Sequence, residues 1–197
     1  MNVLLTKFPK EIKIGSKFYP IKSDFRIWIK FETEFIKTKD NNEKIELILN
    51  MLEKYPPLKT VTDFETMINA VTSFYNCGEP LGDESSRNKH RTTSVYNFDK
   101  DQFHIYTDFL QFYQIDLNEI RYMHWWKFKQ LFIELPEKSK IKTVMMYRSI
   151  QITSKMSSEH RQFYAKMKKL YSLEDTRTQQ EKIKSAGSVL AGYMKNK

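Results

Sequence analysis

Residues 116–135 read DLNEIRYMHWWKFKQLFIEL and contain two of the chain's three tryptophans side by side. Asp116 with Glu119 has the spacing of a capping box, in which each side chain accepts a hydrogen bond from the other residue's backbone N–H group. Apolar residues then recur at helical spacing, and Pro136 cannot continue the hydrogen-bond ladder. The sequence therefore predicts a helix that begins at Leu117 and ends before Pro136, at the centre of a helical domain.

The adjacent Trp125 and Trp126 have two interpretations. They can supply buried area to a core, or they can form a stacking platform for a ligand or nucleic acid. We favour the core, and we interpret His124 likewise as a hydrogen-bonded interior residue, because no second His or Cys lies at metal-ligand spacing from it. The residues expected in the structural core are Trp28, Phe109, Trp125, Trp126, Phe128 and Leu131.

The composition predicts a mostly α fold. Five glycines in 197 residues are few for a barrel or sandwich, whereas fourteen phenylalanines and eleven tyrosines can fill a helical interior. We expect a compact domain of about seven or eight helices with a small N-terminal β-hairpin. The single Cys77 cannot form an internal disulfide, and no apolar run is long enough for a signal peptide or a transmembrane helix. A soluble protein of a reducing cytosol is the default expectation.

Local signals place the elements along the chain. The hairpin is expected within residues 8–22, where apolar and polar residues alternate on both sides of Gly15-Ser16. Pro56-Pro57 should terminate the second helix. The residues expected to start helices are Ser23 or Asp24, Asp40 with Glu43, Thr62 with Glu65, Asp99 with Gln102, and Ser157 or Ser158. A further short helix is expected at 140–148.

The chain is expected to form one domain over residues 1–172, interrupted by a mobile polar loop at 77–94 in which Gly, Pro, Ser and a basic run replace the apolar periodicity. The net charge of +9 is concentrated in the last third of the chain, C-terminal to this loop. Residues 137–197 contain fourteen Lys and Arg against five Asp and Glu, so the first 136 residues sum to zero. A basic end of this kind indicates a solvated surface or an acidic partner.

The C-terminal segment 173–197 predicts an amphipathic helix over about 179–194. It could pack on the core, bind a partner in a groove, or lie on a membrane surface, although its apolar residues are small and few for a membrane. The partner-binding hypothesis combines this helix with the basic side of the preceding one. Its residues are Ile183, Ala186, Leu190, Met194, Arg161, Lys166 and Lys169.

Catalytic motifs are absent from the sequence. No Walker loop, G-x-G-x-x-G, G-x-S-x-G or H-E-x-x-H pattern occurs, and no carboxylates cluster with a histidine. The residues alone therefore predict a non-enzymatic helical protein without cofactor or metal.

Several stretches resemble one family of phage proteins. They are His124-Trp125-Trp126-Lys127-Phe128 after Asp116-Leu117 and Tyr122, Tyr19-Pro20-Ile21, Asp24-Phe25-Arg26 with Trp28, Tyr147-Arg148-Ser149-Ile150, and Met167-Lys168-Lys169-Leu170-Tyr171. Together they resemble the bacteriophage gene-product-fifteen family over nearly the whole chain.

The resemblance implies a phage or prophage tail assembly chaperone. Such a protein would bind the tape-measure protein in the bacterial host cytoplasm, with tail tube subunits as a second candidate partner, and would be missing from the mature virion. The family provides no catalytic residues to transfer. Two other classes stay open: a basic nucleic-acid-binding regulator, for which we find no recognition-helix pattern, and a structural tail component. The sequence does not specify the oligomeric state.

Overall fold

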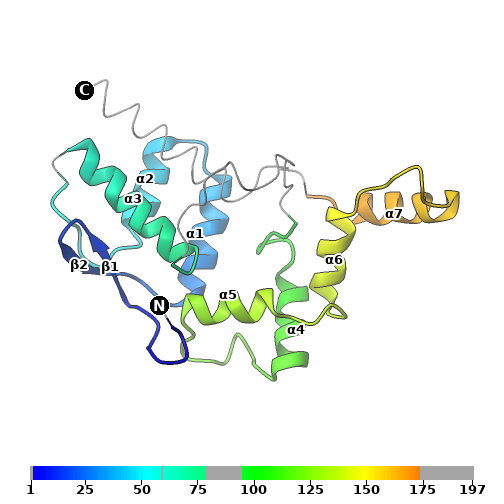
Figure 1. Ribbon diagram of the computed structural model, residues 1–197, viewed down its shortest axis with the longest axis horizontal. Coiled ribbons are helices and arrows are strands. Elements are labelled where there is room, and N and C mark those ends of the chain that lie inside the picture. The colour runs from blue at the N-terminus through cyan, green and yellow to red at the C-terminus, as the bar shows by residue number, and fades with distance from the viewer. Residues whose placement is uncertain (1, 59, 79–94, 174–197) are drawn as a thin grey trace. The chain divides into compact units, whose positions relative to one another are not determined.

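The structure is a computed structural model that describes residues 2–58, 60–78 and 95–173. In chain order its elements are β1 (Glu11–Ile14), β2 (Lys17–Pro20), α1 (Phe25–Lys37), α2 (Asn41–Leu49), α3 (Val61–Tyr75), α4 (Gln102–Tyr113), α5 (Trp125–Ile133), α6 (Lys140–Ser149) and α7 (Ser158–Leu170) (Figure 1). The mostly α fold with an N-terminal hairpin is confirmed. Most of the predicted 77–94 loop and the predicted C-terminal helix lie outside the described residues.

By their internal contacts the described residues group into two compact units. The first unit contains the described residues within Met1–Lys89 and those of Arg121–Gln130. The second contains the described residues within His90–Ile120 and Leu131–Thr178. Along the chain, the boundary falls inside α5. The single-domain interpretation of residues 1–172 stays a prediction.

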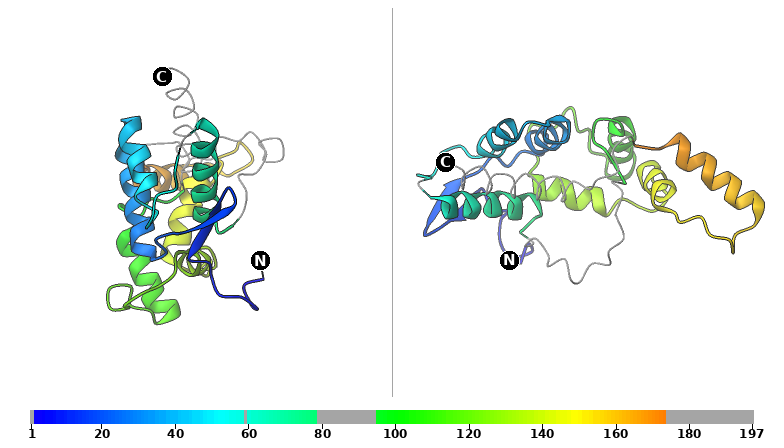
Figure 2. Two further views of the ribbon diagram at one scale, coloured as in Figure 1. Left: turned by 90° about the vertical axis from the view of Figure 1, so that its left-hand side faces the viewer. Right: turned by 90° about the horizontal axis from the view of Figure 1, so that it is seen from above.

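The hairpin forms where the alternating pattern predicts it. β1 and β2 pair antiparallel, with Ile12 opposite Tyr19. Gly15 in the turn has a φ of +61°, a left-handed conformation that glycine adopts without strain. Ile12, Ile14 and Tyr19 are buried, and the hairpin lies beside α3 (Figure 2). It therefore contributes one side of the first unit's core.

Aspartate side chains start α1 and α2 as predicted. Asp24 accepts a hydrogen bond from the backbone N–H group of Arg26, and Asp40 accepts from two N–H groups in the first turn of α2. Each carboxylate satisfies backbone donors that have no partner inside the helix.

The end of α2 differs from the prediction. The helix stops at Leu49, well before Pro56-Pro57. The next residues are held by hydrogen bonds from elsewhere in the fold, because Lys22 donates its backbone N–H group to the Met51 carbonyl (2.9 Å) and Leu52 forms a bridge with Ile21. Long-range pairing ends this helix, and the prolines do not.

Two predicted helix starts are wrong by two residues, because α3 and α4 have other residues at their N-cap positions. α3 is capped by Thr60, which exchanges hydrogen bonds with Asp63, and the expected Thr62 lies inside the helix. α4 has Asp101 at its N-cap position in place of Asp99. The backbone N–H group of Asp99 donates to the side chain of Asn97, so Asp99 belongs to the turn before the helix.

The tryptophan helix is shorter than predicted. Asp116 caps a turn by accepting from the backbone N–H group of Asn118 (2.8 Å), and this hydrogen bond lowers the pKa of the Asp116 carboxyl group. The helix itself begins only at Trp125. Its start is delayed because Asp24 and His124 form an antiparallel bridge, in which the Trp125 N–H group donates to the Ser23 carbonyl at 2.7 Å. Tertiary pairing outweighs the local capping signal here.

The first unit has an aromatic core around Trp28. Its indole stacks on Phe74 and Trp125, with ring centroids 5.3 and 6.0 Å apart, and its N–H group donates to the Lys22 carbonyl. Phe25 stacks on Phe128 at 4.8 Å. Because these rings come from α1, α3 and α5, aromatic packing joins segments that are far apart in the sequence.

The second unit is built on α4, α6 and α7. Phe109 of α4 and Ile141 and Val144 of α6 are fully buried, and α6 packs against both neighbours. Leu131, expected in the core, is only half-buried, and its carbonyl accepts a hydrogen bond from the Tyr113 hydroxyl.

Candidate protein-binding surface

Trp125 and Trp126 are both interior residues. Trp125 is fully buried and Trp126 nearly so. Their indole N–H groups donate to the carbonyls of Tyr75 (2.9 Å) and Phe74 (2.7 Å), the last residues of α3. Neither ring presents a face to solvent on which a base could stack. The described geometry therefore assigns the pair to packing between α3 and α5.

His124 is the N-terminal cap of α5. Its Nδ1 atom accepts a hydrogen bond from the Trp126 backbone N–H group at 3.0 Å. Its Nε2 atom lies 2.8 Å from the Pro9 carbonyl, which can only accept, so Nε2 carries the proton and the ring is neutral. Burial lowers the pKa of His124, and nearby Lys10 lowers it further, against a raising effect of the hydrogen bond to Pro9. The imidazole thereby joins the N-terminal segment to α5.

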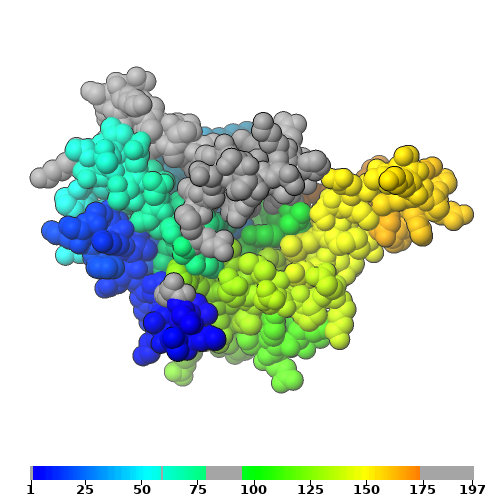
Figure 3. Space-filling model, in the orientation of Figure 1, coloured from blue at the N-terminus to red at the C-terminus, as the bar shows by residue number. Residues whose placement is uncertain are grey.

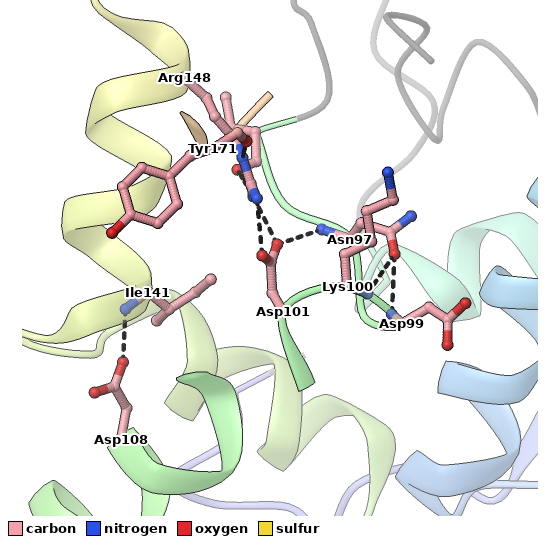
Figure 4. Close-up of polar contacts among 9 residues, drawn as sticks. Asn97, Asp99, Lys100, Asp101, Asp108, Ile141, Arg148 and Tyr171 are labelled. Carbon is pink, nitrogen blue, oxygen red and sulfur yellow. Dashed lines mark hydrogen bonds and ion pairs between the residues drawn. The ribbon is translucent and has the colours of Figure 1, made fainter. Parts of the chain in front are cut away.

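Arg148 and Asp101 form a buried ion pair in the second unit. The guanidinium group makes two hydrogen bonds to the carboxylate, of 2.6 and 2.8 Å (Figure 4). It also donates to the carbonyls of Val95 and Tyr171. The Asp101 carboxylate in turn accepts from the Asn97 backbone N–H group. One side chain of α6 thus ties together the segment before α4 and the end of α7.

Asp108 gives α6 a second buried anchor. Its carboxylate accepts hydrogen bonds from the backbone N–H groups of Lys140 (3.0 Å) and Ile141 (2.7 Å), at the first turn of α6. A carboxylate at a helix N-terminus satisfies unpaired donors and complements the helix dipole. The buried acids of this unit are therefore used in structure.

The metal-ligating side chains of the described residues do not cluster as a metal site requires. No group of three or more His, Cys, Asp or Glu side chains in residues 2–58, 60–78 and 95–173 is arranged to hold a metal ion. An open groove of about 380 Å³ lies at the hairpin end of the first unit. Its walls carry both signs of charge, from Lys10, Lys22, Glu11, Asp24 and Glu53, so it does not select one class of charged ligand.

The most exposed helix is α7. None of its residues is buried, and α7 extends to the right of α6 in Figure 3. It contacts α6 through the rings of Phe163, Tyr164 and its C-cap residue Tyr171, which all lie against Tyr147. Phe163 and Leu170 remain 48 % and 66 % exposed. Large apolar side chains that stay in solvent on one helix indicate a surface that a partner can cover.

The basic residues predicted to form the partner surface of α7 differ in their exposure and hydrogen bonding. Lys166 and Lys169 are exposed, and among the described residues neither makes a hydrogen bond or ion pair with another side chain. Arg161 is half-buried and donates to the carbonyls of Ser154 and Met156, so it holds the α6–α7 connection. The rest of the predicted partner surface, Ile183, Ala186, Leu190 and Met194, lies outside the described residues.

Sequence reasoning missed Arg148, Asp101 and Asp108. A signal for Arg148 exists, because it continues the buried row of Ile141 and Val144 at helical spacing. A charged residue on an apolar row requires a buried partner. The sequence does not show which carboxylate provides it.

These features define a small helical protein with an aromatic core and a basic, partly apolar outer helix. A family model described as Bacteriophage Gp15 protein matches residues 4–173, so the chain belongs to that phage protein family. No curated protein and no solved structure was found to match the chain. No helix among the described residues has the length and apolar character needed to cross a membrane.

Proposed function

We propose that this phage protein is a tail assembly chaperone that binds the tape-measure protein transiently in the host cytoplasm, with tail tube subunits as a second candidate partner. Membership of the Gp15 family supports a phage role. The observation that carries the proposal is α7, a helix without a single buried residue on which Phe163 and Leu170 stay 48 % and 66 % exposed. The proposed role requires neither catalysis nor a cofactor.

The chemistry of a tape-measure protein explains why such a surface is useful. A very long helical chain with exposed apolar stripes aggregates unless the stripes are covered until tube subunits assemble around it. An apolar helix with a basic edge can cover these stripes reversibly, because apolar contacts supply affinity while charges mainly raise the association rate.

Co-expression of the chain with the tape-measure protein of the same phage tests the proposal. We expect the two proteins to co-purify and the tape measure to stay soluble only in the presence of this chain. Truncation after Ser172 should give a folded protein that co-purifies more weakly, because it removes the predicted stripe but keeps α7 and Tyr171, which contacts Tyr147 and Arg148. Far-UV circular dichroism checks folding. A wild-type chain that never co-purifies with the tape measure refutes the proposed function.

Mass spectrometry of purified virions separates a chaperone from a structural component. A transient chaperone should be missing from mature particles. Its presence at a fixed copy number relative to the tube protein would assign it to the tail structure.

A further inference from the structure

One row of α7 combines exposed apolar and charged side chains. Phe163 and Leu170 are seven residues apart, which places them on the same side of the helix about 10.5 Å from each other along its axis. This is the heptad spacing at which helices pair side by side. Lys166 lies between them, three residues after Phe163 and four before Leu170, and is exposed. We name Phe163, Lys166 and Leu170 the α7 row.

The position of Lys166 determines what can cover the row. A partner helix that contacts both Phe163 and Leu170 also removes Lys166 from water. Burying an ammonium group without a partner is strongly unfavourable, so an apolar or basic partner binds poorly. A carboxylate on the covering helix converts that cost into a charge-assisted hydrogen bond.

The surroundings of the row are mostly positive. Lys169 adds positive charge beside it, whereas Glu159, the single acidic residue of α7, lies on the same side of the helix four residues before Phe163. Within 137–173 Lys and Arg outnumber Asp and Glu by nine to two. Lys168 donates a hydrogen bond to the Ile150 carbonyl, whereas the Lys169 side chain is exposed to solvent. An acidic partner is therefore attracted over a wider area than the row itself.

From this geometry we infer that the α7 row binds an amphipathic helix that places apolar residues seven apart on Phe163 and Leu170, with an Asp or Glu between them on Lys166. The inference rests on the proposed function, in which the helix is a segment of the tape-measure protein. It adds the chemistry of that segment: helical, apolar on one side, and acidic where it meets this chain.

The test uses the full chain and overlapping synthetic peptides that cover the tape-measure sequence. Binding is measured by fluorescence anisotropy. We expect the tightest peptides to carry the apolar–acidic–apolar pattern. Leu170→Ser should weaken them by about 30-fold or more, as loss of an apolar anchor does. The double variant Lys166→Glu, Lys169→Glu should weaken them about tenfold at low salt and remove most of the salt dependence.

Two controls keep the test specific. The variant Lys13→Glu, Lys17→Glu changes the net charge equally, but at exposed positions of the hairpin, and should bind like the wild type. Because Leu170 is 66 % exposed, Leu170→Ser should melt like the wild type. A clear loss of thermal stability would mean that the chain itself already covers the row, and would overturn the inference.

Three further outcomes would overturn it. The tightest peptides could be basic or lack the heptad pattern. The wild-type chain and both variants could co-purify equally with the intact tape measure, which would leave the proposed function standing and refute only the site. Binding to duplex DNA that is lost in the double Lys variant but unchanged in Leu170→Ser would assign the row to nucleic acid.

Discussion

Replacing Arg148 by methionine should destabilise the second unit strongly. Methionine keeps much of the apolar stem but removes the guanidinium group, which leaves the Asp101 carboxylate, 3 % exposed, without its cation. Breaking a buried ion pair from one side costs roughly 3 to 5 kcal/mol. The carbonyls of Val95 and Tyr171 also lose a donor, at about 1 kcal/mol each where water does not replace it. We expect a loss of at least about 3 kcal/mol.

Adding Asp101→Asn to Arg148→Met should recover part of that loss. The amide is neutral and can still accept from the Asn97 N–H group, so the uncompensated buried charge is removed. The only remaining cost is the loss of the hydrogen bonds from Arg148 to the Val95 and Tyr171 carbonyls. The double variant should then be destabilised by only about 2 kcal/mol. A double variant more stable than the single one is the distinguishing result.

Urea unfolding followed by circular dichroism measures these differences. The three tryptophans, Trp28, Trp125 and Trp126, all belong to the first unit, so their fluorescence reports on that unit separately. Lys30→Met is the matched control, because it breaks an exposed ion pair with Glu34 and should cost less than about 0.5 kcal/mol. If Arg148→Met costs no more than this control, or if the double variant is the less stable one, the buried charge does not determine the stability of the unit.

Three other perturbations test the fold. Trp125→Ala should cost roughly 3 to 5 kcal/mol because the ring is fully buried, and a melting curve like that of the wild type would show the site to be peripheral. Burial lowers the pKa of His124 in the folded protein below its unfolded value of about 6.5, so the unfolded state binds the proton first. Stability should therefore be complete above about pH 6.5 and decline as the pH falls through the folded pKa, and His124→Asn should flatten that decline in pH-dependent urea titrations. Limited proteolysis of the native chain should cut first at Arg87, Lys89 or Arg91, and protection of these bonds would contradict the predicted mobile loop.

Elements that depend on neighbouring residues could be read from the sequence. The hairpin needs an alternating pattern and a glycine in its turn, and Gly15 provides the left-handed conformation. The caps Asp24, Asp40 and Ser157 each bond to N–H groups two or three residues ahead. Such bonds require no knowledge of the rest of the chain, because the acceptor and the donor are brought together by the helix itself.

The candidate surface was predicted in part for the same reason. The periodicity of α7 places Lys166 between Phe163 and Leu170 on one side of the helix, with Lys169 next to that side, and this placement is a property of one helix. That Leu170 and about half of Phe163 stay exposed, although the Phe163, Tyr164 and Tyr171 rings contact Tyr147 of α6, depends on where α6 lies. Exposure is therefore decided only in three dimensions.

The start of the tryptophan helix shows what only the tertiary structure decided. Asp116 and Glu119 carry a valid local capping signal, yet the chain stays non-helical until Trp125, because Ser23 and Asp24 pair with the residues around His124. Arg148 finds Asp101 across 47 residues in the same way. The sequence shows which polar and charged groups need a partner once they are buried. Which partner they obtain depends on segments far apart in the chain coming together, and the fold must offset the entropic cost of closing those long loops.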